Sequence, residues 1–298
     1  MAAILECVPN ISEGRDLEKV EKILDSVRAV AEVKLLDYSS DKDHNRSVIT
    51  FLGEPKAVIE AAHALAKAAT ELIDMREHTG GHPRMGAVDV IPLIPIKDIS
   101  IEETIALSKE LAQKIADSCS MHVTLYEQSA SAPHRQNLAS VRKGQYEAME
   151  EKIKEKEWIP DYGPREFNKK AGIVAVGARP PLVAYNINLS TSDEQIAKKI
   201  ANVVRAAKGG FAYCKAMGLL IEETGKAQVS MNLVHPDMTT IFRVFEAVER
   251  EAHRYGVSVT DSEIVGLVPM KSLIDTAIYH LKLDNFSMDQ ILETRIWE

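Results

Sequence analysis

The sequence predicts an α/β protein of the α+β type, made of two split βαβ (ferredoxin-like) subdomains. Its length of 298 residues favours two domains over one. Short apolar runs alternate with longer amphipathic segments, which indicates strands mixed with helices. The order strand, helix, strand, strand, helix, strand occurs in the first half and returns in the second. We therefore expect one subdomain at residues 1–179 and the other at residues 180–298.

The first half supplies its elements in that order. An apolar run at 4–8 ends at Pro9 and predicts a strand. The helix predicted next, at 17–30, has apolar residues at helical spacing, and Ser12 or Asp16 suits its N-cap. The remaining strands are predicted at 33–37, 47–52, 88–94 and 123–126, and the remaining helices at 56–75 and 101–118.

The second half follows a connecting segment. Residues 146–158 alternate Glu with Lys and predict an exposed helix or connector, and 159–172 predict an ordered loop between the halves. Strands are then predicted at 183–189, 216–221, 228–233 and 264–268, with helices ending at Val204 and spanning 238–255. Two such sheets, each with helices on one face, would bury their bare faces against each other. A ligand cleft would lie along their edge or their junction.

The charge and cysteine content exclude several classes of protein. There are 36 Lys and Arg against 44 Asp and Glu, a net charge of −8, so general binding to nucleic acid or an anionic membrane is not expected. No run approaches the roughly 20 apolar residues that cross a bilayer. The three cysteines, Cys7, Cys119 and Cys214, suit reduced thiols and a cytoplasmic location. Nucleotide-binding loops, the serine-hydrolase motif and zinc-type cysteine spacing are also missing.

The most informative segment runs from His78 to Asp89. Two histidines four apart can bind a metal on a helix, but the glycines and Pro83 between and after them disfavour a helix here. His82 precedes that proline on a rigid turn, which suits a general acid–base with an ordinary pKa of about 6.5. Arg84 adds a fork for a carboxylate. The alternatives are a surface loop with two solvated histidines, and a metal-dependent hydrolase using His78 and His82.

Two further polar clusters stand out. The segment 37–46 holds acidic residues, His44, Asn45 and Arg46 between two strands, and taken alone it is better explained as a polar hairpin loop. The second cluster is basic and lies between the halves; in a chain of net negative charge it would hold carboxylates or else form a solvated loop. Its members are Arg165, Lys169, Lys170 and Arg179.

Several of these strings together resemble the formiminotransferase domain family. The resemblance runs in order from Ile4 to about residue 273. It is carried by Glu6-Cys7-Val8-Pro9-Asn10-Ile11-Ser12-Glu13-Gly14, Asn45-Arg46, His82-Pro83-Arg84-Met85-Gly86-Ala87-Val88-Asp89, Ala184-Tyr185-Asn186-Ile187-Asn188-Leu189 and Val265-Gly266-Leu267-Val268-Pro269.

The resemblance implies two α/β subdomains with facing sheets, a homodimer, and transfer of the formimino group of N-formimino-L-glutamate to N5 of tetrahydrofolate. It places the catalytic histidine on His82 and requires no metal; tetrahydrofolate is a co-substrate. The folate-binding segment falls on Gly163, Pro164, Arg165, Glu166, Phe167, Asn168, Lys169, Lys170, Ala171 and Gly172. Substrate contacts are expected from Asn10, Asn45, Arg46, Arg84, Arg179, Asn186 and Asn188.

The sequence also departs from the family pattern, and alternatives stay open. Animal members continue into a cyclodeaminase domain, whereas this chain stops at Glu298, so we expect no cyclodeaminase activity. Ser39 stands where animal members carry an acidic residue, which Asp41 or Asp43 would replace. A formyl transferase using 5-formyltetrahydrofolate or N-formylglutamate, and a non-catalytic folate-binding module, remain alternative functions.

Overall fold

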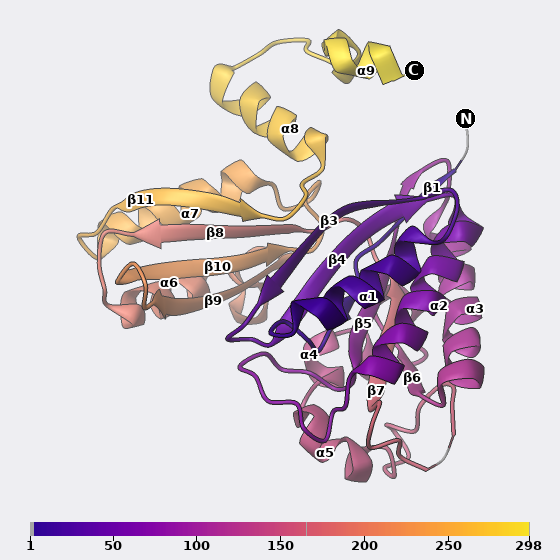
Figure 1. Cartoon of the computed structure of the whole chain (residues 1–298). Coiled ribbons are helices and arrows are strands. Elements are labelled where there is room, and N and C mark those ends of the chain that lie inside the picture. Colours follow the sequence, from indigo (N-terminus) through magenta and orange to yellow (C-terminus); the bar gives the residue numbers. More distant parts are fainter. Residues whose placement is uncertain (1–2, 165, 298) are drawn as a thin grey trace. The chain divides into compact units, whose positions relative to one another are not determined.

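The computed structural model describes residues 3–164 and 166–297 and divides into two compact units (Figure 1). Unit 1 is Met1–Pro180 and unit 2 is Pro181–Glu298. Each unit has its own sheet, with seven strands in unit 1 and four in unit 2. The predicted α/β class with two sheets is therefore confirmed. The predicted packing of the two sheets face to face stays a prediction.

Unit 1 has a strand or helix at each range predicted within residues 4–126, with a short unpredicted strand at 10–11, and then continues with further elements. Asp16 caps α1, where its carboxylate accepts from the Lys19 amide at 3.1 Å, so the second of the two proposed caps is the one used. The strands are β1 (Ile4–Cys7), β2 (Asn10–Ile11), β3 (Val33–Asp41), β4 (Arg46–Gly53), β5 (Val88–Lys97), β6 (His122–Leu125) and β7 (Ile173–Ala178). The helices are α1 (Leu17–Arg28), α2 (Pro55–Leu72), α3 (Ile101–Cys119), α4 (Leu138–Val141) and α5 (Gln145–Lys152).

The unit 1 sheet is an antiparallel core with a parallel extension. β4 pairs antiparallel with β3 on one side and with β1 and β2 on the other, and these two pair antiparallel with β5. β7 then pairs in parallel with both β5 and β6. Helices α1, α2 and α3 cover one face of this sheet, where their apolar sides form the main core (Figure 1).

Strand β7 is an element that the sequence analysis missed. All six of its residues are buried, because α4 and α5 pack over the opposite face of this end of the sheet. Its sequence, Ile173-Val174-Ala175-Val176-Gly177-Ala178, is the continuous apolar run typical of a strand covered on both faces. The connector predicted at 146–158 is helical only as far as Lys152 and continues as turns.

Unit 2 is a four-stranded antiparallel sheet with two helices on one face (Figure 1). Its strand order is β11-β8-β10-β9, which with the chain order βαββαβ is the split βαβ arrangement predicted. The strands are β8 (Val183–Leu189), β9 (Cys214–Ile221), β10 (Lys226–Leu233) and β11 (Val259–Val265). The helices are α6 (Glu194–Val204), α7 (Ile241–Arg254), α8 (Met270–Leu281) and α9 (Leu292–Trp297).

The last third of unit 2 corrects the predicted boundaries. The final strand covers 259–265 rather than 264–268, because its mostly exposed residues lack an apolar pattern and Gly266, at φ +74°, ends it. Helix α7 begins at Ile241 rather than 238, since residues 235–239 turn first. Helices α8 and α9 were not predicted.

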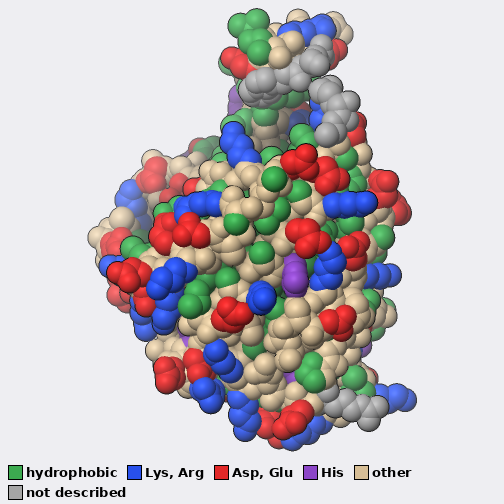
Figure 2. Space-filling model, turned by 45° about the vertical axis from the view of Figure 1, so that its right-hand side comes forward, with side chains coloured by type: hydrophobic (Ala, Val, Ile, Leu, Met, Phe, Trp, Pro, Cys, Tyr) green, Lys and Arg blue, Asp and Glu red, His purple; other side chains and the backbone are tan. Residues whose placement is uncertain are grey.

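The surface carries interspersed charges. Figure 2 shows acidic and basic side chains mixed over the face in view, without one broad basic field. Within residues 3–164 and 166–297, no helix is long and apolar enough to cross a bilayer.

Candidate functional site

Three loops of unit 1 meet around His82. The Asn45 side chain joins them, because its oxygen accepts from the Gly14 amide at 3.0 Å and its nitrogen donates to the Thr79 carbonyl at 2.9 Å. The Gly81 amide donates to the Asp43 carbonyl at 3.0 Å. The turn that carries His82 is therefore fastened to the hairpin between β3 and β4. One of the two N–H groups of the Asn45 amide and one lone pair of its oxygen are used within the protein. Asn45 therefore holds the loops together, and its contact with a substrate stays a prediction.

Glycine is needed where these loops touch. A Cβ on Gly80 would lie 2.3 Å from the His44 carbonyl oxygen, and one on Gly14 would lie 2.3 Å from that of Asp41. Such contacts are closer than van der Waals packing allows, so only glycine permits this approach of backbone to backbone. The glycines flanking the candidate histidine thus serve loop packing in this structure.

His82 is half-buried and surrounded by positive charge. The Arg46 Nη1 atom lies 3.3 Å from both ring nitrogens, within hydrogen-bonding distance of whichever nitrogen is unprotonated. Burial, followed by the charges of Arg46 and Arg142, lowers the pKa of His82 from 6.5 to about 3. The imidazole is therefore neutral near pH 7, and its one unprotonated nitrogen can accept a proton or a hydrogen bond.

Arg84 is bound within the protein. Its Nε donates to His78 Nδ1 at 3.2 Å, and its Nη2 donates to the His78 carbonyl at 3.2 Å. The other bonds form a fork on the Glu147 carboxylate, at 2.6 and 2.9 Å, and reach the Gln145 side chain at 3.1 Å. All five guanidinium N–H groups thus have partners. Arg84 holds the loop to α5 and has no donor left for a substrate carboxylate.

His78 has a fixed tautomer. Its Nδ1 accepts from the Arg84 guanidinium, which can only donate, so the proton sits on Nε2 and is donated to the Asn45 carbonyl at 2.9 Å. Burial lowers the pKa of His78. With both ring nitrogens engaged, His78 has no lone pair to offer a metal. In the described part of the chain, no group of three or more His, Cys, Asp or Glu residues is placed to hold a metal ion.

The segment 163–172 lies directly against the loop that carries His82. Gly86 and Gly172 form an antiparallel bridge, and the amide of Ile173 donates to the Met85 carbonyl at 3.0 Å. Tyr146 joins the same two loops, since its amide donates to the Arg84 carbonyl and its hydroxyl to the Lys169 carbonyl. The structure therefore brings the predicted folate-binding segment and the predicted catalytic turn side by side.

Many side chains in this segment serve its own shape. Asn168 accepts from the amides of Lys170 and Ala171, and Lys170 Nζ donates to the Glu71 carbonyl at the end of α2. Phe167 stacks on the buried His122 ring with 5.8 Å between centroids. Lys169 is exposed and pairs with Glu150 at 3.2 Å. Gly163, at φ +109°, packs on the Met121 carbonyl, Pro164 and Glu166 are exposed, and Arg165 lies outside the described residues.

The other predicted substrate contacts fall into two groups. In unit 1, Asn10 and Arg46 lie on the sheet face that α1–α3 do not cover, because their neighbours in sequence point into the core. Arg179 follows β7 and hydrogen-bonds the Pro180 carbonyl at 3.0 Å. In unit 2, Asn186 and Asn188 lie on the helix-free face of β8 and donate to Glu263 at 2.9 Å and Asp261 at 2.5 Å.

Arg142 is a residue of this site that the sequence analysis missed. It follows α4 and forms an ion pair with Asp89 of β5, whose carboxylate also accepts from the Met85 amide at 3.0 Å. Its charge is close enough to lower the pKa of both Arg46 and His82. Asp89 stood in the string that carried the family resemblance, but nothing in the sequence joined it to an arginine 53 positions away.

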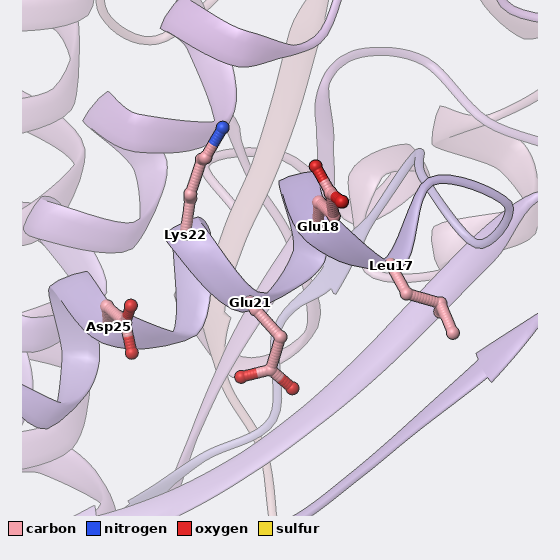
Figure 3. A pocket seen from close by; sticks show the side chains of 5 residues that line it. All are labelled: Leu17, Glu18, Glu21, Lys22 and Asp25. Atoms are coloured by element: carbon pink, nitrogen blue, oxygen red, sulfur yellow. The ribbon is translucent and has the colours of Figure 1, made fainter.

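A hollow elsewhere on unit 1 does not fit the expected substrates. It lies on the exposed side of α1, and the side chains that line it project from a single helix in different directions (Figure 3). Three of its five residues are acidic, which disfavours carboxylate ligands. Its lining is Leu17, Glu18, Glu21, Lys22 and Asp25.

Comparisons with known proteins match almost the entire chain. Residues 4–179 match the N-terminal subdomain of the formiminotransferase domain, and residues 184–296 match the formiminotransferase domain. The chain is 49% identical over 297 residues to the glutamate formimidoyltransferase of Streptococcus pyogenes serotype M1, covering 99% of both chains. It is 45% identical over 296 residues to that of Thermoplasma acidophilum, covering 99% and 97%. It is 39% identical over 285 residues to rat formimidoyltransferase-cyclodeaminase, covering 94% of this chain and 53% of that protein.

Proposed function

Because the chain belongs to the formiminotransferase domain family, we propose that it transfers the formimino group of N-formimino-L-glutamate to N5 of tetrahydrofolate, with His82 moving the protons. The products are 5-formiminotetrahydrofolate and L-glutamate. The relatives that match this chain from end to end are glutamate formimidoyltransferases. The observation that carries the role of His82 is its position, as a neutral, half-buried imidazole beside the Arg46 guanidinium.

The reaction exchanges one carbon–nitrogen bond for another. The N5 lone pair attacks the formimino carbon of the protonated amidine, and a tetrahedral carbon bonded to both nitrogens forms. N5 then loses its proton, the glutamate nitrogen gains one, and the bond from the carbon to that nitrogen breaks. His82 is suited to take the first proton because its ring is neutral, and to deliver it to the leaving amine. The reaction involves no net oxidation or reduction of the substrates.

The folate is proposed to bind at the segment 163–172. This segment is bridged to the His82 loop at Gly86 and Gly172, so a ligand resting on it would lie near the imidazole. Lys169 is proposed to bind the folate carboxylates, because its ion pair with Glu150 is exposed and therefore weak, whereas Lys170 Nζ donates to the Glu71 carbonyl of α2. That Asn186 and Asn188 of unit 2 contact a substrate stays a prediction. We place the division between subdomains after residue 179.

The chain is also proposed to act as a homodimer in the cytoplasm. Helix α8 and its flanks expose apolar side chains, and among the described residues of α8 only Ser272 is buried. A second copy of the chain would cover this surface. The cysteines are free and buried, which suits a reducing compartment. The exposed apolar residues here are Val265, Leu267, Met270, Leu273, Tyr279, Leu281 and Leu283.

The deciding experiment is direct turnover. The purified chain is mixed with N-formimino-L-glutamate and tetrahydrofolate, and the 5-formimino product is followed by absorbance and mass spectrometry. One parallel reaction replaces the donor with N-formylglutamate, another offers 5-formyltetrahydrofolate as donor with L-glutamate as acceptor, and a third contains EDTA. We expect the formimino donor to be used and EDTA to have no effect. Preference for a formyl donor would indicate the alternative formyl transferase. Loss of turnover in EDTA would indicate a metal-dependent enzyme, and binding of folate without turnover would indicate a non-catalytic binding module.

A further inference from the structure

Two arginines, Arg46 and Arg142, flank His82 and form what we call the arginine pair. Arg46 begins β4 and Arg142 follows α4, so the chain brings them together from segments almost a hundred residues apart. Both are partly buried, and each lies near enough to lower the pKa of His82. Arg142 also lowers the pKa of Arg46. Holding two guanidiniums close together costs free energy, which an anion between them would recover.

The charges of this cluster do not cancel. Arg142 pairs with Asp89, whose side chain is 2% exposed. Arg46 forms no ion pair within residues 3–164 and 166–297, and the nearby Asp41 carboxylate is bound to His44 at 2.6 Å. The Nε atoms of both arginines are buried and have no hydrogen-bond partner in the same part of the chain. Unpaired buried donors of this kind are rare in native proteins.

We propose that the arginine pair forms one anion-binding site, which holds the α-carboxylate of the formimino donor next to His82. This inference rests on the proposed transferase function and identifies which group of which substrate orients the reaction. Guanidinium forks suit carboxylates because they offer parallel N–H donors. Arg46 carries one positive charge that no ion pair of the described residues neutralises, and one bound carboxylate would neutralise it.

The covalent structure of the substrates selects the α-carboxylate of the donor. His82 must reach the nitrogen that carries the formimino group, and Arg46 is 3.3 Å from the ring of His82. In the donor, the α-carboxylate is attached to the same carbon as that nitrogen, whereas the γ-carboxylate is three carbons further along. The carboxylates of tetrahydrofolate are separated from N5 by the whole aminobenzoyl group, so they cannot lie at His82 during transfer.

Occupation of this site would also prepare His82 for its role. The neighbours that act electrostatically on the ring are Arg46, Arg142, His44 and Asp41. A carboxylate on the arginine pair offsets the two positive charges that disfavour the imidazolium. The ring can then keep the proton taken from N5 until the leaving nitrogen accepts it.

The test compares two donor analogues in the intact protein. One is the α-amide of N-formimino-L-glutamate and the other is its γ-amide, and each removes a single negative charge. Losing a charged hydrogen-bonded partner should lower kcat/KM for the α-amide about 10- to 100-fold relative to the γ-amide in the wild-type chain. In Arg46→Gln and Arg142→Gln this preference should shrink to within about threefold, while the KM for tetrahydrofolate stays near its wild-type value.

Folding is controlled separately. Arg142→Gln leaves the buried Asp89 carboxylate unpaired, so the double variant Arg142→Gln with Asp89→Asn is measured as well. Arg28→Gln serves as the matched control, because Arg28 forms exposed ion pairs with Glu21 and Asp25 on α1. This control should keep the wild-type preference. Circular dichroism confirms that each variant is folded before kinetics are compared.

The outcomes separate this inference from the proposed function. If the wild-type chain does not use N-formimino-L-glutamate at all, the proposed function fails. If it does, but accepts the α-amide as well as the γ-amide, or keeps its preference in both arginine variants, the carboxylate site is wrong. Tetrahydropteroate, which lacks the glutamyl carboxylates, tests whether the arginine pair binds a carboxylate of tetrahydrofolate instead. A change in preference between it and tetrahydrofolate in the arginine variants would place the folate tail at this site and overturn the proposal.

Discussion

The properties of His82 are set by the charges around it. An isolated imidazole has a pKa near 6.5, but burial and two guanidiniums keep this ring neutral well below that value. A neutral imidazole has a free lone pair for a proton, but the lowered pKa makes it a weak base until the surrounding positive charges are offset. The free protein therefore presents a base, and the acid form arises only during turnover.

This charge state can be measured in the free protein. Since the pKa of His82 is lowered to about 3, the ring should stay neutral as the pH falls from 8 to 5, passing through 6.5 without protonation. Nitrogen-15 shifts of the imidazole, assigned by comparison with His82→Ala, report this directly. A midpoint near 6.5 would contradict the environment described here.

Removing the imidazole should affect turnover far more than binding. We expect His82→Ala to lower kcat by about 10²-fold or more, because proton transfer loses its carrier, while the Kd for tetrahydrofolate changes little. His253→Ala, an exposed histidine on α7, is the matched control and should retain activity. Near-normal kcat in His82→Ala would remove this residue from the mechanism.

The predictable and unpredictable residues of the site differ in a simple way. His82 and Arg46 could be selected because they stand in distinctive strings. The commitment of Arg84 and Asn45 to internal hydrogen bonds could not be foreseen, because most of their partners (Gly14, Thr79, Gln145 and Glu147) lie 31 to 63 positions away. No motif or apolar period marks the segment around Arg142. Its ion pair with Asp89 forms through the packing of α4 near β5.

Among the elements, β7 determines how the site is assembled. Its first residue, Ile173, donates to the Met85 carbonyl, and Gly172 just before it bridges to Gly86, so the segment 163–172 is fastened to the His82 loop. Gly172 has φ +72°, and a Cβ on it would lie 2.3 Å from the Met85 carbonyl oxygen. Both the backbone conformation and the contact therefore require glycine.

Substitution at Gly172 separates these two requirements. Gly172→Ala should lower the free energy of unfolding by more than the approximately 1–2 kcal/mol expected for the left-handed conformation, because the new methyl group also collides with backbone. Gly256→Ala is the control, with φ +70° and nothing within 4 Å. Urea unfolding compares the two, and equal losses would show that the crossing of the loops is looser than described.

The end of α4 offers a second test at this scale. Lys152 Nζ donates to the carbonyls of Ser140, Val141 and Lys143, which surround Arg142. Lys152→Met should lower the free energy of unfolding by about 1–3 kcal/mol and reduce kcat/KM for the donor, because buried carbonyls lose their donor and Arg142 shifts. Lys154→Met, at an exposed neighbouring position, should change neither quantity. Thermal and urea unfolding measure the change in the free energy of unfolding, and steady-state kinetics measure the change in kcat/KM.

Strands and helices with a clear apolar period were predictable, and the exceptions have physical causes. The edge strand β11 exposes most of its residues, so it lacks the alternation that marks a half-buried strand. Strand β7 has no alternation either, because both of its faces are covered. Helix α8 shows little burial along its length, so its formation depends on more than a buried apolar face.

For the whole molecule, the proposed homodimer gives a direct prediction. The chain of 33.0 kDa should elute with twice that mass in size-exclusion chromatography with light scattering. Leu281→Glu on α8 should shift the mass toward the monomer, because it places a charge in the apolar surface, and Leu17→Glu on α1 should not. A monomeric wild-type chain would contradict the proposal, and a dimer unaffected by Leu281→Glu would move the interface elsewhere.

The bridge between the His82 loop and β7 has a consequence for biosynthesis. The loop at residues 78–87 depends on partners from the hairpin at 41–46, from α5 and finally from residues 171–173. A nascent polypeptide therefore cannot close this loop until roughly the first 173 residues have emerged from the ribosome. The proton-transfer turn, although encoded early in the message, is completed only when translation of unit 1 is nearly finished.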